Sequence, residues 1–174
     1  MTTQVPNNMM ADGAVSTAKL ADAAVTQAKL GTNVAGNGPL FSATQTTGTQ
    51  SLSANTWTKL QFAVENYDTA NCYDNTTNYR FTPNVAGYYQ INVAVEFNSS
   101  TLSGAGVFKN GSIYKAAYAS NPNVGASATV SCVVYCNGTT DYIEVWGYSN
   151  AAGTVLYGSA ANGYEFSGFL ARAA

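Results

Sequence analysis

The sequence predicts an all-β protein built as an antiparallel sandwich. Beyond Pro39 the chain consists of short segments with strand character, separated by turns rich in Gly, Asn and Ser. The clearest segment is 87–97, where apolar residues occupy every second position, as in a half-buried strand: Tyr89, Ile91, Val93, Val95 and Phe97. No helical stretch interrupts this region. Regular short strands without helices favour two antiparallel sheets packed face to face.

Ten strands are expected in this region. In chain order they are 40–44, 57–64, 79–82, 87–97, 104–109, 112–118, 126–136, 141–149, 153–157 and 163–171. Pro83 and Gly87 mark a turn just before the clearest strand. Asn-Gly dipeptides at 110–111 and 137–138 predict tight hairpins, because both central residues of such a turn need positive φ.

The composition points to an oligomer. The 174 residues allow one domain of ordinary size plus an appendage. Hydrophobic residues make up 46% of the chain, but charged residues make up only 9%, against roughly 25% in an average soluble protein. A closed oligomer removes apolar surface from water and accounts for this shortage of charge.

The charge pattern gives no sign of a nucleic-acid or membrane partner. The formal net charge is −2, and the seven basic residues are scattered along the chain. No apolar run is long enough to span a membrane. Residues 1–10 lack the basic start and apolar centre of a secretory signal, so we expect assembly in a cytosol.

The residue types that carry most enzyme chemistry are scarce. The chain has no His, which removes the usual general base and most zinc sites. Asp141 with Glu144, or Glu65 with Asp68, could form a glycan-hydrolysing pair, but we favour the explanation that they are ordinary turn or edge residues. Asp68, Asp74 and Asp141 could contribute to a calcium site, although no loop forms a cage. We expect no enzyme activity, cofactor or metal.

Three cysteines cannot all pair within one chain. Cys132 and Cys136 would lie on one face of a strand ~13 Å apart, too far for a disulfide. We expect buried thiols in a reducing cytosol. A bridge from Cys72 to either of the others remains open.

A spaced series of residues in 62–89 carries a family resemblance. The series is Phe62, Asp68, Tyr73, Phe81, Gly87 and Tyr89. It resembles the signature of the globular head of complement C1q, whose fold is shared with tumour necrosis factor. Segment 166–170 is similar to the last strand of that family, and 108–111 to its central hairpin. The resemblance covers about residues 40 to 171 and implies a ten-stranded jelly roll over 37–174 that forms a threefold homotrimer.

The closing strand is the expected trimer contact. Phe166 and Phe169 have opposite parity, so both cannot face the sandwich interior of a regular strand. Both are candidate trimer contacts, and we expect at least one of them to meet a neighbouring subunit.

The N-terminal arm contains an internal repeat. Segments 11–20 and 21–30 align without gaps. Their apolar residues recur every five positions, which fits neither a coiled-coil heptad nor a strand: Val15, Leu20, Val25 and Leu30. Asp12 and Asp22 could cap short helical turns, which would need neighbouring chains for stability. A flexible linker is the alternative.

The ten-residue repeat resembles repeats in tail-fibre and related appendage proteins of bacteriophages. This resemblance implies an N-terminal anchor at 1–10 and a stalk at 11–36 that bind other virion proteins. The residues expected to anchor the particle are Val5, Pro6, Val15, Leu20, Val25 and Leu30. The whole chain is then a virion protein, a tail or head fibre or spike assembled in the host cytoplasm.

Tyrosine is abundant, with 12 residues in the chain. Tyr118 and Tyr148 lie beside polar loops, and aromatic faces next to amides and hydroxyls suit stacking on sugars. The candidate contacts with a host-surface glycan or receptor are Tyr118, Asn121, Asn123, Tyr148 and Asn150. Two alternatives to the virion spike remain: a bacterial surface or secreted binding module of the same fold, and a small glycan-cleaving spike.

Overall fold

The computed structural model describes residues 16, 25, 29–30, 36–45, 48–98, 100–121, 126–152, 154–157 and 164–174. The chain divides into two compact units, Met1–Gly31 and Thr32–Ala174. The described residues of the first unit are all exposed, and Val25 and Leu30 are among them. The other four expected anchoring residues, Val5, Pro6, Val15 and Leu20, lie outside the described part.

The second unit consists of strands and turns, which confirms the all-β prediction. Its described strands are β1 (Leu40–Thr44), β2 (Thr49–Leu52), β3 (Thr58–Lys59), β4 (Val64–Asp68), β5 (Tyr73–Asp74), β6 (Arg80–Phe81), β7 (Ala86–Asn98), β8 (Ser100–Lys109), β9 (Ser112–Asn121), β10 (Ala126–Asn137), β11 (Ile143–Ser149), β12 (Thr154–Tyr157) and β13 (Glu165–Ala173). No helix among the described residues is long and apolar enough to cross a membrane.

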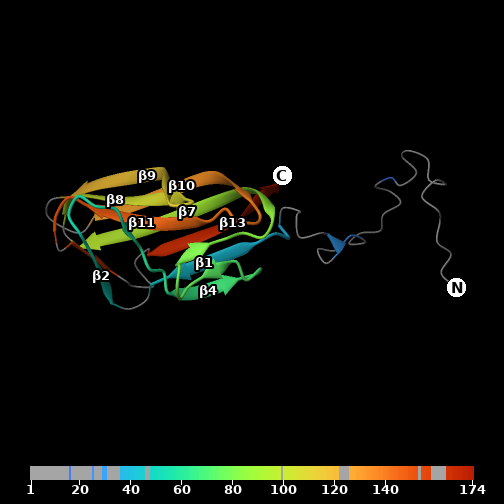
Figure 1. The fold of residues 1–174 in the computed structure, drawn as a ribbon, viewed down its shortest axis with the longest axis horizontal. Coiled ribbons are helices and arrows are strands. Elements are labelled where there is room, and N and C mark those ends of the chain that lie inside the picture. The colour runs from blue at the N-terminus through green and yellow to red at the C-terminus, as the bar shows by residue number, and fades with distance from the viewer. Residues whose placement is uncertain are drawn as a thin grey trace. The chain divides into compact units, whose positions relative to one another are not determined.

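The strands form two antiparallel sheets (Figure 1). In the first sheet, β7 pairs with β10 on one edge and with β13 on the other, and β1 and β4 continue beyond β13. β12 pairs with the end of β7 and with β2. The second sheet has the order β5-β6-β11-β8-β9, with β3 also on β11. Strands far apart in sequence are therefore neighbours, as a jelly roll requires.

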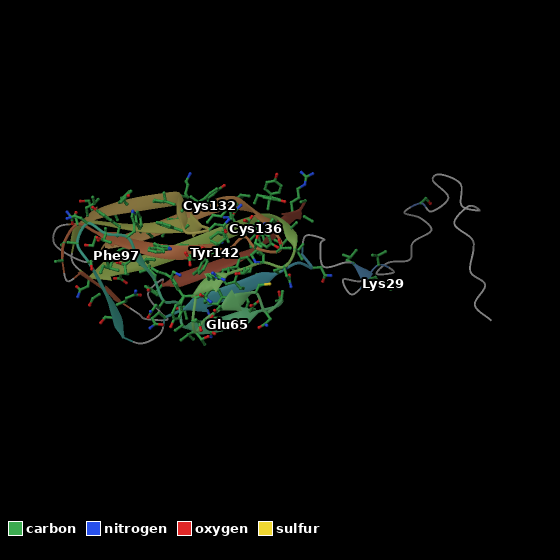
Figure 2. All side chains as sticks on the ribbon, viewed as in Figure 1. Lys29, Glu65, Phe97, Cys132, Cys136 and Tyr142 are labelled. Atoms are coloured by element: carbon green, nitrogen blue, oxygen red, sulfur yellow. The ribbon has the colours of Figure 1, made fainter. Side chains whose placement is uncertain are left out.

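The strand β7 behaves as its alternation predicts. Its inward residues are between 0 and 3% exposed, and they are Tyr89, Ile91, Val93, Val95 and Phe97. The residues between them are only partly buried or exposed. Alternation therefore placed one face of this strand in the core and the other on the surface. Figure 2 labels Phe97 on this strand.

Aromatic rings from both sheets meet in the core. The ring of Phe41 on β1 stacks 4.2 Å from that of Phe81 on β6, and Phe81 lies 5.5 Å from Tyr89 on β7. Phe41 also meets Phe166 on β13 edge-on at 4.8 Å. Offset and edge-on pairs of this kind add to the free energy gained by burial. They fix the two sheets face to face.

Some expected elements differ from the observed ones. Segment 57–64 was expected to be one strand, but only β3 and the first residue of β4 fall within it. Leu60 and Phe62 are fully buried in the irregular stretch between these strands. These two residues alternate with polar ones because their side chains are buried, although the backbone here does not pair continuously with another strand. The Leu60 N–H donates one hydrogen bond to Val145 O, at 2.9 Å.

Only one of the two Asn-Gly sites is the expected tight hairpin. Asn110 and Gly111 both have positive φ, 52° and 76°, between β8 and β9. At the second site Gly138 has a φ of 75°, but the flanking strands β10 and β11 belong to different sheets. There the Asn137 side-chain oxygen accepts the N–H groups of Thr139, Thr140 and Asp141, which shapes a longer crossover. The prediction of a hairpin at 137–138 was wrong because Asn and Gly serve crossovers as well.

The three cysteines are free thiols. Cys72 and Cys136 are buried and Cys132 is partly buried; Figure 2 labels the latter two. Burial raises the pKa of the Cys136 thiol to about 12, so it is protonated and unreactive at neutral pH.

Candidate functional site

The structure brings together two of the residues expected to contact a glycan. The ring of Tyr118 on β9 lies 5.9 Å from the ring of Tyr148 on β11. Trp57, which the sequence did not single out, completes the cluster at 6.0 Å from Tyr118 and 5.5 Å from Tyr148. Tyr118 is 55% exposed. We call Trp57, Tyr118 and Tyr148 the aromatic cluster.

Strand register explains why these rings meet. Gly104 on β8 pairs with Tyr148 on one side and with Tyr118 on the other. Because Gly104 has no side chain, the two tyrosines face each other across it. Trp57 comes from the segment before β3, which pairs with β11, and its ring lies over Gly106. The cluster thus occupies the outer face of the second sheet.

The other three residues expected to contact a glycan are not seen to contact the aromatic cluster. Asn123 lies outside the described residues, and for Asn121 only the backbone is described. The Asn150 side-chain oxygen accepts the Leu102 N–H at 3.1 Å, which is a structural role. Asn55, which was not predicted, accepts the Tyr148 hydroxyl at 3.1 Å.

A second candidate surface is the outer face of the first sheet. Five large apolar residues there are between 38 and 50% exposed, and we call them the apolar patch: Leu40, Tyr88, Val133, Tyr135 and Phe169. Leu40 pairs with Phe169, and the rings of Tyr88 and Tyr135 lie 5.4 Å apart. Contiguous exposed apolar residues on a sheet mark an interaction surface.

Three polar residues on the same face hydrogen-bond to one another, and one of them, Gln90, lies between Phe169 and Val133. Gln90 donates to the Ser131 hydroxyl at 2.8 Å and to Asn92 Oδ1 at 3.1 Å. Ser131 donates to the same Asn92 oxygen at 3.0 Å. Because these side chains hydrogen-bond to one another, a second subunit that covers this face would leave few polar atoms without a hydrogen-bond partner.

Phe166 and Phe169 have different positions. Phe166 is fully buried among the core aromatics, so its proposed role as a trimer contact is corrected: its own subunit already covers it. Phe169 is 44% exposed and belongs to the apolar patch. The parity of the strand separates the two, as expected.

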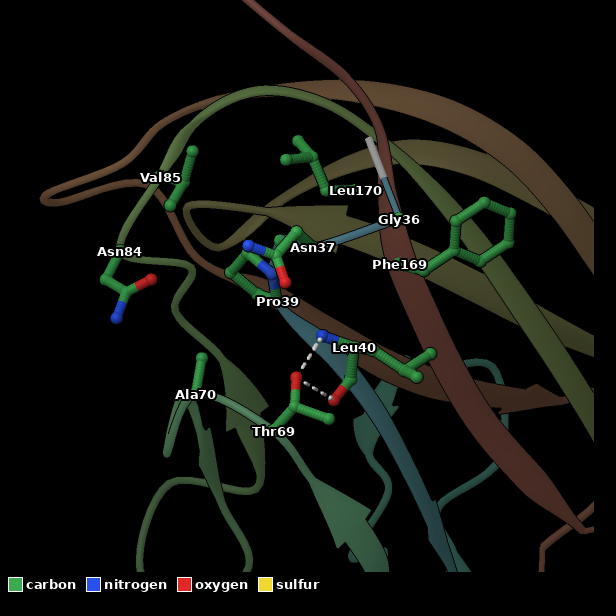
Figure 3. A pocket seen from close by; sticks show the side chains of 11 residues that line it. Gly36, Asn37, Pro39, Leu40, Thr69, Ala70, Asn84, Val85, Phe169 and Leu170 are labelled. Carbon is green, nitrogen blue, oxygen red and sulfur yellow. Dashed lines mark hydrogen bonds between the residues drawn. The ribbon is translucent and has the colours of Figure 1, made fainter. Parts of the chain in front are cut away.

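A hollow of about 720 Å³ adjoins the apolar patch, where 36–40 enter the sheet (Figure 3). Leu40 and Phe169 belong to both. The Thr69 hydroxyl fastens one wall by accepting the Leu40 N–H at 3.0 Å. All the lining residues are uncharged, so this hollow offers no acid or base.

Asp68 and Asp74, which were considered for calcium binding or hydrolysis, accept backbone hydrogen bonds from their own loops. Asp68 accepts N–H groups of Ala70 and Tyr73 at 3.1 and 2.7 Å, and it also accepts that of Cys72. Asp74 accepts those of Thr76 and Thr77, which hold the pKa of its carboxyl far below its ordinary value. No metal-binding group of three or more side chains occurs among the described residues.

Asp141 and Glu144 form ion pairs with different lysines. Lys109 approaches Asp141 to 2.8 Å and, with Asn110, lowers the pKa of that carboxyl. Glu144 is 3% exposed, pairs with Lys59, and accepts the Trp146 indole N–H at 3.2 Å. Each carboxylate is thus paired with a lysine, and the two do not form the acid and base pair that glycan hydrolysis would need.

Comparison with known proteins gives similarity at the level of fold. No family model and no curated protein matches the chain. The globular domain of zebrafish complement 1qA is 14% identical, covering 78% of this chain and 99% of that domain, with a TM-score of 0.56. Eiger, a tumour necrosis factor of S. frugiperda, is 11% identical, covering 78% and 94%, with a TM-score of 0.61.

A third similar structure is a vertex protein. The PRD1 vertex protein P5 is 15% identical, covering 76% of this chain and 96% of that protein, with a TM-score of 0.56. Nearly the whole of each of these three solved chains matches residues of this chain. The chain therefore has the jelly-roll fold of complement C1q and tumour necrosis factor heads.

Proposed function

We propose that this protein is a structural virion protein, a trimeric fibre or spike of a bacteriophage. Its N-terminal arm attaches to other virion proteins, and its jelly-roll head projects outward, where it meets the host surface. The observation that carries this proposal is the combination of a phage-like ten-residue repeat at 11–30 with a head of this fold. The similarity of the head to the PRD1 vertex protein P5 supports the same assignment.

The apolar patch supports self-association of the head. Phe169 and its neighbours expose large apolar side chains, and the chain has few charges with which to keep a monomer soluble. The free edge of β10 is blocked, because Tyr114 and Lys109 donate hydrogen bonds to the Val133 and Tyr135 carbonyl oxygens. Association through the sheet face is thereby favoured over strand addition. The resemblance to complement heads implies threefold symmetry.

A bacterial surface or secreted binding module is the second candidate function. The similar zebrafish and insect domains support it, because this fold is not confined to virus particles. The arm repeat favours the virion assignment. A glycan-cleaving spike is disfavoured, because Asp141 and Glu144 are paired with different lysines and Asp68, in the other candidate pair, accepts backbone N–H groups.

Imaging of intact particles tests the assignment. Particles assembled with the full chain should show the protein projecting from their surface, in threefold copies. A variant lacking residues 1–36 should give a folded, soluble head that does not join the particle. Incorporation of this truncated protein at normal copy number would contradict the anchoring role of the arm.

A further inference from the structure

The aromatic cluster has the form of a prearranged platform. Its three rings lie within 5.5 to 6.0 Å of one another, and their planes are inclined by 47° to 82°. Each ring comes from a different part of the second sheet: the segment before β3, β9 and β11. The rings thus present faces and edges in several orientations over a small area.

Two glycines form the floor of this platform. A Cβ atom at Gly104 would lie 2.7 Å from a ring carbon of Tyr118, and one at Gly106 would lie 2.9 Å from a ring carbon of Trp57. Both distances are too short for a real side chain, so the rings rest on bare backbone. The missing side chains at these two positions therefore let the rings approach the sheet closely.

The loop that carries Trp57 is fastened at the same place. Asn55 has a positive φ of 55°, its N–H donates to Ser149 O at 2.7 Å, and its side chain accepts the Tyr148 hydroxyl. One residue thus links the Trp57 segment to the end of β11. A ligand would meet an arrangement that already exists.

The chemistry of the platform selects an uncharged ligand. Two ionic groups on the strands next to the cluster, Lys59 on β3 and Glu144 on β11, form an ion pair with each other. The Tyr118 hydroxyl has no hydrogen-bond partner among the described residues, and this ring is the most exposed of the three. A ligand must therefore offer apolar faces for the rings together with hydroxyl groups, without formal charge.

The strand beneath the cluster, β8, has no free backbone groups for a peptide. β8 is paired on both sides, with β9 and with β11, so its backbone offers no free N–H or C=O to an extended peptide. A pyranose ring needs no such partner, because its C–H face stacks on an aromatic ring and its hydroxyls reach side chains or water.

We propose that the aromatic cluster is a binding site for a neutral saccharide, with Tyr118 and Trp57 as stacking platforms. This inference rests on the proposed role of the head at the host surface, and it adds the ligand class, a third ring and the glycine floor. The site is a property of the folded head, so it can be measured on the soluble protein without particles.

Binding of dextran, mannan and galactan to the full-length protein tests the proposal, with alginate as an acidic counterpart. The readout is the change in fluorescence of the chain's two tryptophans, with affinity electrophoresis as an independent measure. Trp57→Ala and Tyr118→Ala should each weaken binding at least about tenfold. Tyr118→Phe should keep most of it, since the ring is retained.

Tyr114→Ala is the matched control. Tyr114 is on the same strand as Tyr118 and is 49% exposed, but it lies outside the cluster. Its loss should leave binding unchanged. The proposal is overturned if no neutral polysaccharide binds, if only alginate binds, if a proline-rich peptide binds the cluster in preference, or if both cluster variants bind as the parent does.

Failure of the saccharide site can be distinguished from failure of the proposed virion function. Light scattering on the same samples reports whether the protein is a trimer, and particle imaging reports its location. Saccharide binding by a protein absent from particles would refute the virion assignment and leave the site intact. A trimeric virion protein that binds none of the neutral polysaccharides would refute the site alone.

Discussion

Phe166 and Phe169 lie three residues apart on β13 and face opposite sides of the first sheet. Phe166 is fully buried between the sheets, whereas 44% of Phe169 is exposed beside Leu40. One residue thus contributes to the fold of a single subunit, and the other is available to a second subunit. Substitutions at the two positions should therefore have separable effects.

Phe169→Asp should break up the trimer and leave the subunit folded. The new carboxylate would lie in the apolar patch, where burial of an unpaired charge opposes association. We expect the mass in light scattering to fall to that of one chain at micromolar concentration, with an unchanged β-type circular dichroism spectrum. Ile113→Asp is the control, since Ile113 is 52% exposed on the second sheet. Equal loss of association in both variants would argue against a role for the patch.

Phe166→Ala should instead destabilise the subunit. The ring packs against Phe41, Phe62 and Tyr73 at centroid distances of 4.8 to 5.8 Å. Its removal leaves a cavity, and we expect a loss of about 3 to 5 kcal/mol in the free energy of unfolding. Urea unfolding at fixed protein concentration measures it. A native-like midpoint would show that these rings do not form the core.

Truncations on β7, the strand next to β13, test the same core. Ile91→Ala and Phe97→Ala each remove a fully buried side chain, and each should cost on the order of 2 to 5 kcal/mol. Glu96→Ala, on the outward face of this strand, should change stability by no more than about 0.5 kcal/mol. Native-like melting of both core variants would contradict the assignment of this face.

Stability should decline in acid partly through Asp141. Lys109 and Asn110 lower the pKa of this carboxyl in the folded protein. The unfolded chain therefore takes up the proton first, and the stabilisation is complete above pH ~4 and is lost as the pH falls through the folded pKa. Asp141→Asn should be less stable than the parent at pH 7, and the difference should shrink at pH 3. A difference that stays constant would show that the ion pair contributes nothing.

Gly104→Ala should disturb the aromatic cluster more than the fold. The added Cβ would approach the Tyr118 ring at 2.7 Å, but this ring is half exposed and can swing outward. We expect a small loss of stability, about 1 kcal/mol, with shifted NMR signals of Tyr118. Gly168→Ala is the contrast, because its Cβ would meet Ile91 inside the core at 2.7 Å. Equal destabilisation by both changes would contradict the surface position of the cluster.

The sequence predicted the fold where burial follows alternation. The strand β7 was found because its alternating apolar residues show its inward face plainly. β2 and β5 were missed: Thr49–Leu52 is mostly polar and Tyr73–Asp74 is too short to show a period. Such strands form because a strand elsewhere in the sequence pairs with them. The local sequence pattern does not show this pairing.

The candidate sites were predicted only in part for a related reason. Tyr118 and Tyr148 were found because each is an aromatic residue next to a polar loop. Trp57 was missed because its place over Gly106 depends on the pairing of β3 with β11. Likewise, parity indicated that Phe166 and Phe169 differ, but it could not tell which of them faces inward.

The mass of the full-length protein in solution tests the central claim most directly. We predict that light scattering at micromolar concentration gives three times the 18.1 kDa of the chain, independent of dilution over this range. Each pair of subunits should bury on the order of 1,600 Å² or more. A mass of one chain would contradict both the trimer and the virion spike that is built on it.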